Sequence, residues 1–201
     1  MVLFLVILEI SRMIALRRQK YFGEMKLFDE AVCLIGTKER KGWKAAMRNG
    51  KEALVRSILL ENYESYYRLA FSYVHQEADA MDIVQEGACK AMAKARSLRE
   101  ERFAGTWIYR IMINTAKDYL KKYEKERGTL REDMAVSQGT ETDLELQEAL
   151  DRLPMQEKTL IILRFYEDKP LAEIAEILQE NLNTVKSRLY RTLEKLRREL
   201  A

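Results

Sequence analysis

The stretch "NTVKSRLYRTLEKLRREL", residues 183–200, predicts an amphipathic helix with a strongly basic surface. Its aliphatic residues recur at steps of four, four, three and four, which places them on one face of an α-helix that must pack against another part of the protein. The clustered positive charge elsewhere commonly attracts phosphate groups, although a solvated basic surface explains the pattern equally well when this helix is considered alone. The aliphatic face comprises Val185, Leu189, Leu193, Leu196 and Leu200, and the basic residues are Lys186, Arg188, Arg191, Lys195, Arg197 and Arg198.

The segment before this helix predicts its packing partner. Residues 171–178, "LAEIAEIL", have the periodicity of a short helix, and the four residues "QENL" separate it from the basic helix. We expect Asn183 or Thr184 to cap the basic helix, and the small Ala175 to allow a close crossing. A short helix, a tight turn and a longer basic helix are the layout of a helix-turn-helix, whose second helix enters the DNA major groove. The alternative is a pair of helices that only pack against each other and bind no DNA. The positive charge in the first half of the second helix disfavours this alternative.

The composition indicates an all-α protein. The chain has 201 residues, enough for one or two domains, and 47% of them are hydrophobic. Only 8 Gly and 2 Pro interrupt long runs of helix-forming residues, and β-branched alternation is nearly absent. The net charge of +3 is small, so any contact with nucleic acid must depend on local charge. Residues 140–151 contain five acids and no Lys or Arg, and the last helix reverses that sign.

Residues with metal-binding, redox or catalytic chemistry are scarce. The two cysteines, Cys33 and Cys89, lie far apart in unrelated contexts, which argues against a disulfide framework and is typical of a reducing cytoplasm. His75 is the single histidine, so we expect no metal site. The sequence contains nothing that resembles a nucleophile elbow, a phosphate loop or a Ser/His/Asp set. We therefore expect a cytoplasmic protein that is not an enzyme and uses no cofactor or small-molecule substrate.

The first 50 residues differ from the rest of the chain. Their apolar run, within "MVLFLVILEISRMIALRR", is interrupted by Glu9 and covers about 16 residues, or roughly 24 Å as a helix, against about 30 Å of bilayer hydrocarbon. A secretory signal would carry its positive charges before this run, whereas here they come within or after it. An interfacial helix, a weak membrane anchor and residues upstream of the true start remain open. We favour the last interpretation, with Met25 and Met47 as plausible initiators.

Two helical blocks follow, joined by a linker. Residues 52–123 are predicted to be helical with one break, whereas residues 126–143 lose the periodicity and gather Gly, Thr, Ser and acids. The periodicity returns at 144–153, and Pro154 suits the first turn of the next helix. We therefore predict an N-terminal extension of uncertain status at 1–50, a domain at 51–125, a flexible linker at 126–143 and a second domain at 144–201.

Three apolar stripes define the predicted core of the first block, and Asp79 is expected to cap the helix that carries the second stripe. The third helix also has a basic face, and the charged loop before it, "SLREERFAGTW", is expected to expose Phe103. The stripes are Leu54, Ile58, Tyr66, Leu69, Ala70 and Tyr73; then Val84, Ala88, Ala91 and Ala95; then Ile108, Met112, Thr115 and Tyr119. The basic face comprises Arg110, Asn114, Lys117 and Lys121.

Residues 52–201 resemble a bacterial RNA polymerase sigma factor of the extracytoplasmic-function group. The first block contains "DAMDIVQE" and then "TWIYRIMINTAKD", similar to the family's core-binding segment and its promoter-melting helix. The second contains "LAEIAEIL" and "TVKSRLYR", similar to the domain that reads the minus-thirty-five element. The order of these motifs around a linker makes the resemblance specific. It implies a protein that binds core RNA polymerase and promoter DNA, is held inactive by an anti-sigma factor, responds to stress and is monomeric when free.

The resemblance also implies roles for residues, and the solvated-surface alternative stays open for each polar one. One set on the second helix would bind core polymerase: Asp79, Asp82, Ile83, Gln85 and Glu86. A second set would contact the melted minus-ten strand, where aromatic and cationic groups hold unstacked bases: Phe103, Trp107, Tyr109, Arg110, Asn114 and Lys117. For Trp107 we slightly favour a place in the core. A third would contact the upstream duplex: Asn183, Thr184, Lys186, Ser187, Arg188 and Arg191.

The sequence departs from the family pattern at several positions. The turn of the helix-turn-helix lacks the usual Gly, so we expect Asn181 to adopt the left-handed conformation in its place. Pro170 stands where a capping Ser is usual, and the small Gly87 and Ala88 are expected to loosen the core-binding helix. Two other classes of function remain open: a helix-turn-helix regulator that binds duplex DNA without polymerase, and a helical adaptor that binds only proteins.

Overall fold

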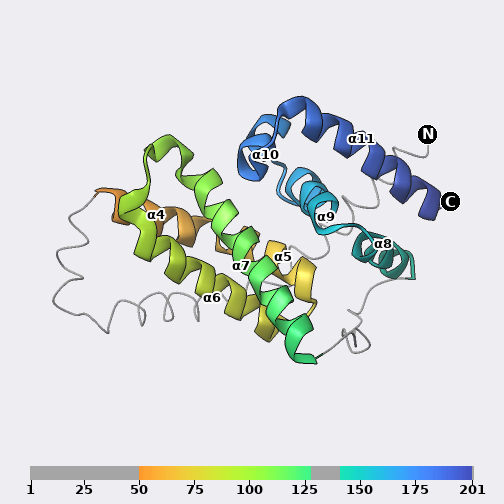
Figure 1. The fold of residues 1–201 in the computed structure, drawn as a ribbon, viewed down its shortest axis with the longest axis horizontal. Coiled ribbons are helices and arrows are strands. Elements are labelled where there is room, and N and C mark those ends of the chain that lie inside the picture. The colour runs from red at the N-terminus through yellow and green to blue at the C-terminus, as the bar shows by residue number, and fades with distance from the viewer. Residues whose placement is uncertain (1–49, 128–140, 201) are drawn as a thin grey trace. The chain divides into compact units, whose positions relative to one another are not determined.

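The computed structural model describes residues 50–127 and 141–200, with side chains at 50–125 and 145–200 (Figure 1). Every regular element in these ranges is helical, which confirms the all-α prediction. The extension at 1–49 and most of the linker lie outside the described residues. The chain divides into two compact units, described separately below as the N-terminal body (50–127) and the C-terminal body (141–200).

The N-terminal body contains four helices: α4 Gly50–Glu61, α5 Tyr63–Val74, α6 Glu77–Lys94 and α7 Ala104–Arg127. Two single 3₁₀ turns, η2 Ala95–Ser97 and η3 Glu101–Phe103, form the connection between α6 and α7. The prediction of one break was wrong. The chain also breaks at Asn62, whose Nδ2 donates to the carbonyl of Ile58 at 2.9 Å, and at His75, which ends α5 in the left-handed conformation with φ 56°.

The core of the N-terminal body follows most of the three predicted stripes, and on α5 Tyr66, Leu69, Ala70 and Tyr73 of the first stripe are buried. The α6 stripe is fully buried, and on α7 Ile108, Met112 and Thr115 are buried, whereas Tyr119 is half-buried. On α4 the prediction was wrong by one position, because Val55 and Leu59 are buried while their apolar neighbours Leu54 and Ile58 are only half-buried. Because Leu54 and Val55 are adjacent, as are Ile58 and Leu59, the apolar periodicity of the sequence was compatible with either of two neighbouring helix faces.

Gly87 tightens the packing of α6 against α7, contrary to the prediction that it loosens it. A Cβ added at Gly87 would lie 2.4 Å from Sδ of Met112 and 3.8 Å from the Met112 Cα. Met112 is itself buried in the core. Met112 of the neighbouring helix therefore fills the space that a side chain at position 87 would occupy, so the absence of a side chain leaves no cavity.

The C-terminal body contains α8 Glu141–Asp151, α9 Met155–Ile161, a π-helical turn η4 Ile162–Tyr166, α10 Leu171–Leu178 and α11 Leu182–Glu199. The predicted seam of α11 is confirmed, since Val185, Leu189, Leu193 and Leu196 are buried and Leu200 is half-buried. This seam packs against α8, α9 and α10. Pro154 precedes α9 as its N-cap, not within its first turn as predicted.

Two ion pairs hold the helices of the C-terminal body together. Lys158, which is buried on α9, pairs with Asp151 at the end of α8. Lys195 on α11 lies 2.7 Å from Glu157 on α9. Part of the predicted basic surface of α11 therefore serves to attach the helix to its neighbours.

Candidate nucleic-acid and polymerase interfaces

The turn between α10 and α11 is built around Gln179. Gln179 adopts the left-handed conformation, with φ 56°, and the amide of Glu180 donates to the carbonyl of Ala175 at 2.9 Å, which closes α10. The prediction that Asn181 takes this conformation was wrong, because Asn181 has extended backbone with φ −69°.

Asn181 is instead the N-cap of α11, a role that was wrongly predicted for Asn183 or Thr184. The Asn181 side-chain oxygen accepts a hydrogen bond from the amide of Asn183 at 2.8 Å. An extended residue whose side chain satisfies a free amide of the first turn is the usual N-cap arrangement. Since α11 starts at Leu182, the side chains of Asn183 and Thr184 remain exposed on its first turn.

The exposed face of α11 carries most of the predicted duplex contacts. The exposed members are Asn183, Thr184, Lys186, Ser187 and Arg191. The Ser187 hydroxyl donates to the carbonyl of Asn183 at 2.8 Å, and Arg191 Nε donates weakly to the carbonyl of Ser187 at 3.3 Å, so both side chains lie along the helix surface. Lys186 and Arg191 form no ion pair within the described parts of the chain.

Tyr190 is a candidate contact that the sequence analysis missed. Its relative exposure is 67%, and it is the one large hydrophobic residue that is exposed within the described ranges. The signal was present in the sequence, because Tyr190 follows Lys186 by four residues and Ser187 by three and lies outside the aliphatic seam.

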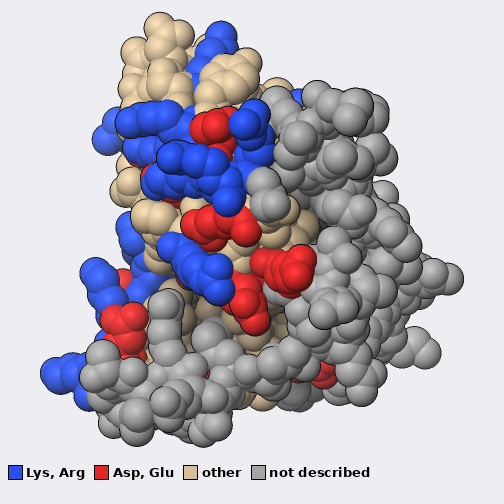
Figure 2. All heavy atoms as spheres, turned by 90° about the vertical axis from the view of Figure 1, so that its right-hand side faces the viewer, with Lys and Arg blue, Asp and Glu red and all other residues tan. Residues whose placement is uncertain are grey.

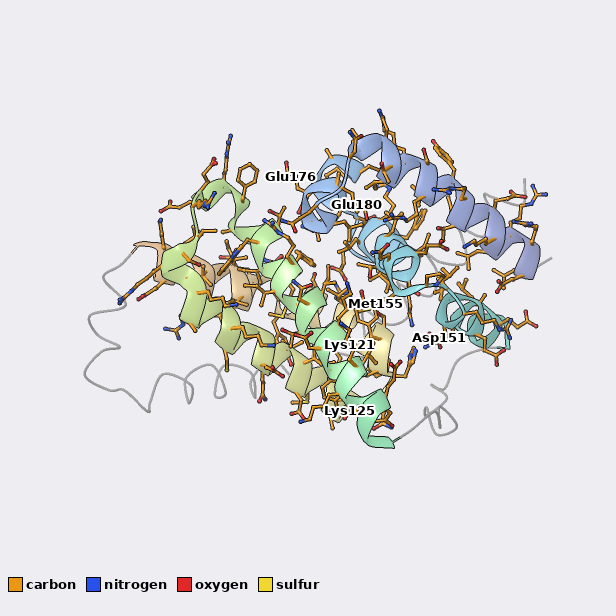
Figure 3. All side chains as sticks on the ribbon, viewed as in Figure 1. Lys121, Lys125, Asp151, Met155, Glu176 and Glu180 are labelled. Atoms are coloured by element: carbon orange, nitrogen blue, oxygen red, sulfur yellow. The ribbon has the colours of Figure 1, made fainter. Side chains whose placement is uncertain are left out.

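Arg188 lies apart from the other predicted contacts. Its Nη1 is 2.8 Å from Oε1 and 2.7 Å from Oε2 of Glu180 in the turn. Both side chains are largely covered, with 18% of Arg188 and 22% of Glu180 exposed. Figure 3 labels both Glu180, in the turn that follows α10, and Glu176, in the last turn of α10. The structure therefore places Arg188 at the edge of the exposed face and against the turn.

The predicted minus-ten contacts lie at the start of α7 and on its polar side. Asn114 is exposed, whereas Arg110 and Lys117 are half-buried. Trp107 is also half-buried, which leaves part of the ring accessible. Phe103 was expected to be exposed but is half-buried, with the Arg102 guanidinium 4.5 Å from its ring centroid.

Tyr109 is a core residue in this structure. It is 2% exposed, and its ring packs edge-on against Tyr66 with a centroid distance of 4.9 Å. A side chain buried in this way has almost no surface to offer a DNA strand. The structure therefore separates Tyr109 from the accessible members of the predicted set.

The acidic residues of α6 form a polar strip along one side of the helix. Asp82 and Glu86 are exposed, Asp79 and Gln85 are half-buried, and Ile83 beneath them is fully buried. Asp79 is not the N-cap, because α6 begins at Glu77 and the cap position is Gln76. Asp79 nevertheless lies in the first turn, where a negative charge stabilises the helix dipole.

Tyr119 of α7 forms a hydrogen bond with Asp79, so the two helices are joined by a polar contact that the sequence did not predict. Burial raises the pKa of Tyr119 well above its usual value, and the hydrogen bond and the negative charges of Asp79 and Asp82 raise it further. The hydroxyl therefore stays protonated and acts as the donor.

Basic and acidic side chains are interspersed on the face of the molecule that Figure 2 shows. In this view Lys and Arg side chains of the described residues gather together, with Asp and Glu side chains set between and beside them. None of the described helices is long and apolar enough to cross a bilayer. Within the same residues there is also no cluster of three or more His, Cys, Asp or Glu side chains that could hold a metal ion.

The comparisons with known proteins match both bodies. The family described as Sigma-70 region 2 matches residues 58–126, and Sigma-70, region 4 matches residues 143–196. RNA polymerase sigma factor SigV of Bacillus subtilis is 46% identical over 153 residues, covering 74% of this chain and 92% of the relative. The ECF RNA polymerase sigma factor SigW of the same organism is 29% identical over 158 residues, covering 68% of this chain and 83% of the relative.

A solved structure supports the same fold. The sigma factor RpoE, in complex with the anti-sigma factor NepR from Bartonella quintana, aligns with a TM-score of 0.61 and 24% identity. The alignment covers 72% of this chain and 95% of RpoE.

Two helical bodies, one of which carries a helix-turn-helix with an exposed basic face, define a DNA-binding transcription protein. The chain belongs to the sigma-70 family of bacterial RNA polymerase sigma factors, in the extracytoplasmic-function (ECF) group. As a member of this family it binds core RNA polymerase and promoter DNA and directs transcription initiation.

Proposed function

We propose that the two bodies divide promoter recognition between them. Residues 51–125 bind core polymerase and the melted minus-ten strand, residues 144–201 bind the minus-thirty-five duplex, and residues 126–143 connect them. The observation that carries this proposal is the exposed face of α11. It presents Lys186, Ser187 and Arg191 on a capped helix whose opposite face is buried.

The polar strip of α6 is the proposed surface for core polymerase. Asp79, Asp82, Gln85 and Glu86 provide acceptors on one side of a helix that is anchored by its buried face. Ile83 supports this surface from within the core. Tyr119 holds Asp79 in place through its hydroxyl, which limits the side-chain freedom that binding would otherwise remove.

The proposed strand contacts are Phe103, Trp107, Arg110, Asn114 and Lys117, and Tyr109 is reassigned to packing. A partly exposed aromatic ring can stack on an unpaired base, which contributes roughly 1 to 3 kcal/mol for each base. The neighbouring cations attract the phosphates of the same strand. Two such stacking contacts would offset the unpairing of a step or two, so strand opening needs no ATP.

The proposed duplex contacts are Asn183, Thr184, Lys186, Ser187 and Arg191. They occupy the first three turns of a helix whose opposite face is buried, the position from which recognition helices read the major groove. An Arg that is free of a carboxylate partner can pair with two acceptors of guanine. Replacing Arg191 with Ala should therefore weaken specific binding by about 1 to 3 kcal/mol.

Regulation by an anti-sigma factor is part of the proposal. The sigma factor RpoE was solved in complex with the anti-sigma factor NepR, and CnrH, a chain of similar fold, was solved in complex with the cytosolic domain of CnrY. We infer that a partner of this kind covers the polar surfaces of the present chain in the cytoplasm until a stress signal releases it. The chain itself is proposed to be monomeric when free and to catalyse no reaction.

Transcription with purified components tests the proposed function. The full chain is mixed with core polymerase and a library of randomised promoters, and the transcripts are sequenced. A sigma factor yields transcripts from promoters with two conserved elements. A regulator that acts without polymerase binds duplex DNA alone, and a protein adaptor does neither; either of these results would contradict the proposal.

A further inference from the structure

The turn of the helix-turn-helix carries a carboxylate that separates Arg188 from the other cations of the duplex-binding face. Arg188 Nη1 lies within 2.8 Å of both oxygens of Glu180, and less than a quarter of either side chain is exposed. Lys186 and Arg191, by contrast, are exposed and lack a carboxylate partner within the described residues. Lys186 and Arg191 are therefore available to bind phosphate, whereas Arg188 is already paired with a carboxylate.

We propose that Glu180 is a specificity-determining residue that withholds Arg188 from the DNA backbone. The proposal rests on the proposed function of α11 as the minus-thirty-five reader. In the bound complex Arg188 stays on Glu180, so sequence-independent attraction is reduced by one cation. Discrimination between promoters then depends more strongly on Lys186, Ser187 and Arg191.

The backbone around Glu180 makes this arrangement rigid. Gln179 fixes the end of α10 in the left-handed conformation, the Glu180 amide donates to Ala175, and Asn181 caps α11. The backbone of Glu180 is thus joined on both sides to helices, α10 and α11, that pack against each other. Few degrees of freedom are lost when the pair forms, unlike in an ion pair between two mobile surface side chains.

Electrostatics favours keeping the pair when DNA arrives. A partly covered ion pair is screened less by salt than an exposed one. Moving Arg188 to a phosphate would leave the Glu180 carboxylate without its partner and close to the negatively charged duplex. The gain from one phosphate contact would therefore be opposed by the loss of the existing pair.

The salt dependence of binding tests this inference. Neutralising one phosphate of B-DNA changes the slope of log K against log salt by about 0.9. Holoenzyme assembled from the full chain is titrated onto the promoter found by library transcription, and onto the same promoter with a scrambled upstream element, between about 50 and 200 mM salt. We expect E180Q to steepen the slope by about 0.9 on both DNAs and to tighten binding at low salt. The affinity for the promoter should then exceed the affinity for the scrambled DNA by a smaller factor than in the wild type. The double variant E180Q/R188Q removes both members of the pair and leaves no unpaired carboxylate near the duplex, so it should keep the wild-type slope.

The control is Glu176, which is exposed on α10 and holds no cation within the described residues. E176Q removes the same charge four residues earlier, in the last turn of α10, without releasing an Arg, so its slope should stay at the wild-type value (Figure 3). Circular dichroism checks that each variant is folded, and E180Q/R188Q decides the matter if E180Q is not folded. A slope that falls by about 0.9 in E180Q/R188Q, or an equal rise in E176Q and E180Q, would overturn the inference. Failure of the wild-type holoenzyme to prefer any promoter would instead refute the proposed function.

Discussion

Gly87 of α6 lies against Met112 of α7, and a side chain at position 87 has no space unless Met112 moves. The Cβ of a substituent would lie 2.4 Å from Met112 Sδ, so the buried Met112 would have to move. We expect Gly87→Val to lower the free energy of unfolding by about 1 to 3 kcal/mol, as overpacking usually does. Gly87→Ala should cost less, because Ala favours a helix interior by about 1 kcal/mol over Gly.

Denaturant unfolding of the full chain measures both effects. Gly105 provides the control, because a Cβ there has no atom within 4 Å. Gly105→Ala should change the free energy of unfolding by no more than about 1 kcal/mol. If Gly87→Val were as stable as the wild type, the close approach described for α6 and α7 would be incorrect.

Tyr119 gives the molecule a pH dependence in the alkaline range. Burial, the hydrogen bond to Asp79 and nearby acids raise its pKa in the folded state above the ordinary value of about 10. As the pH rises past about 10, the unfolded chain loses the Tyr119 proton while the folded chain keeps it. The unfolded state then binds fewer protons, so the free energy of unfolding falls. The stabilising contribution is fully present below about pH 10.

Replacing Tyr119 with Phe should remove this contribution. We expect the free energy of unfolding of Tyr119→Phe to fall less steeply than that of the wild type between about pH 9 and 11. The other tyrosines are common to both proteins, so their ionisation cancels in the difference. Two parallel curves would show that the Tyr119 hydroxyl titrates with its ordinary pKa.

At the scale of single elements, the start of α11 contains one Asn with a structural role and one for which we propose a contact with DNA. Asn181 caps the helix through its side chain, whereas Asn183 contributes only its backbone amide to that hydrogen bond. We expect Asn181→Ala to lower the free energy of unfolding by about 1 kcal/mol. Asn183→Ala should change it by less than about 0.5 kcal/mol but weaken promoter binding. Thermal unfolding and holoenzyme binding measure the two effects, and equal destabilisation by both variants would contradict the assignment of the cap.

The connection between α6 and α7 is held by the first turn of α4. Lys51 Nζ donates to the carbonyl of Leu98 at 2.7 Å, and Glu52 lies 2.7 Å from Arg96. Because an internal hydrogen bond contributes about 0.5 to 1.5 kcal/mol, Lys51→Met should speed amide exchange in residues 95–103 by about 2- to 10-fold. Hydrogen exchange with mass spectrometry measures this rate. Lys94→Met, at an exposed position on α6, is the control, and equal exchange in both variants would refute the role of Lys51.

Helices with one clear apolar face were predictable from the sequence, and the places where they end were not. Residues 171–178 and the seam of α11 have a single apolar stripe, and both are found as predicted. Asn62, His75 and Gln179 end or interrupt helices through side-chain hydrogen bonding or a left-handed backbone. None of these residues is Gly or Pro, so the usual signals for a helix end were missing.

The geometry of the candidate sites was predictable only in part, because long-range partners leave no periodic signal. The exposed cations Lys186 and Arg191 follow from the position of the seam. The pair between Glu180 and Arg188 spans a turn, and the bond between Tyr119 and Asp79 joins two helices. Tyr109 was misjudged because an aromatic residue next to a basic face suits either DNA or the core, and Tyr66 provides its packing partner.

At the scale of the whole molecule, family membership and the two helical bodies lead to one central claim. We propose that the N-terminal body selects bases in the minus-ten strand through Asn114 and its neighbours, and that the C-terminal body selects bases in the upstream duplex through Arg191 and its neighbours. Both residues are accessible and belong to different bodies, so their substitution should have separable effects on promoter choice.

Base preferences in library transcription test this claim most directly. Holoenzymes containing the wild type, Asn114→Ala or Arg191→Ala transcribe the same randomised promoters, and the preferences at the two elements are compared. We predict that Arg191→Ala relaxes the preference in the upstream element alone, with a loss of about 1 to 3 kcal/mol at the affected base pair, and that Asn114→Ala relaxes the minus-ten element alone. Unchanged preferences, or the same change at both elements in both variants, would contradict the division of promoter recognition between the two bodies.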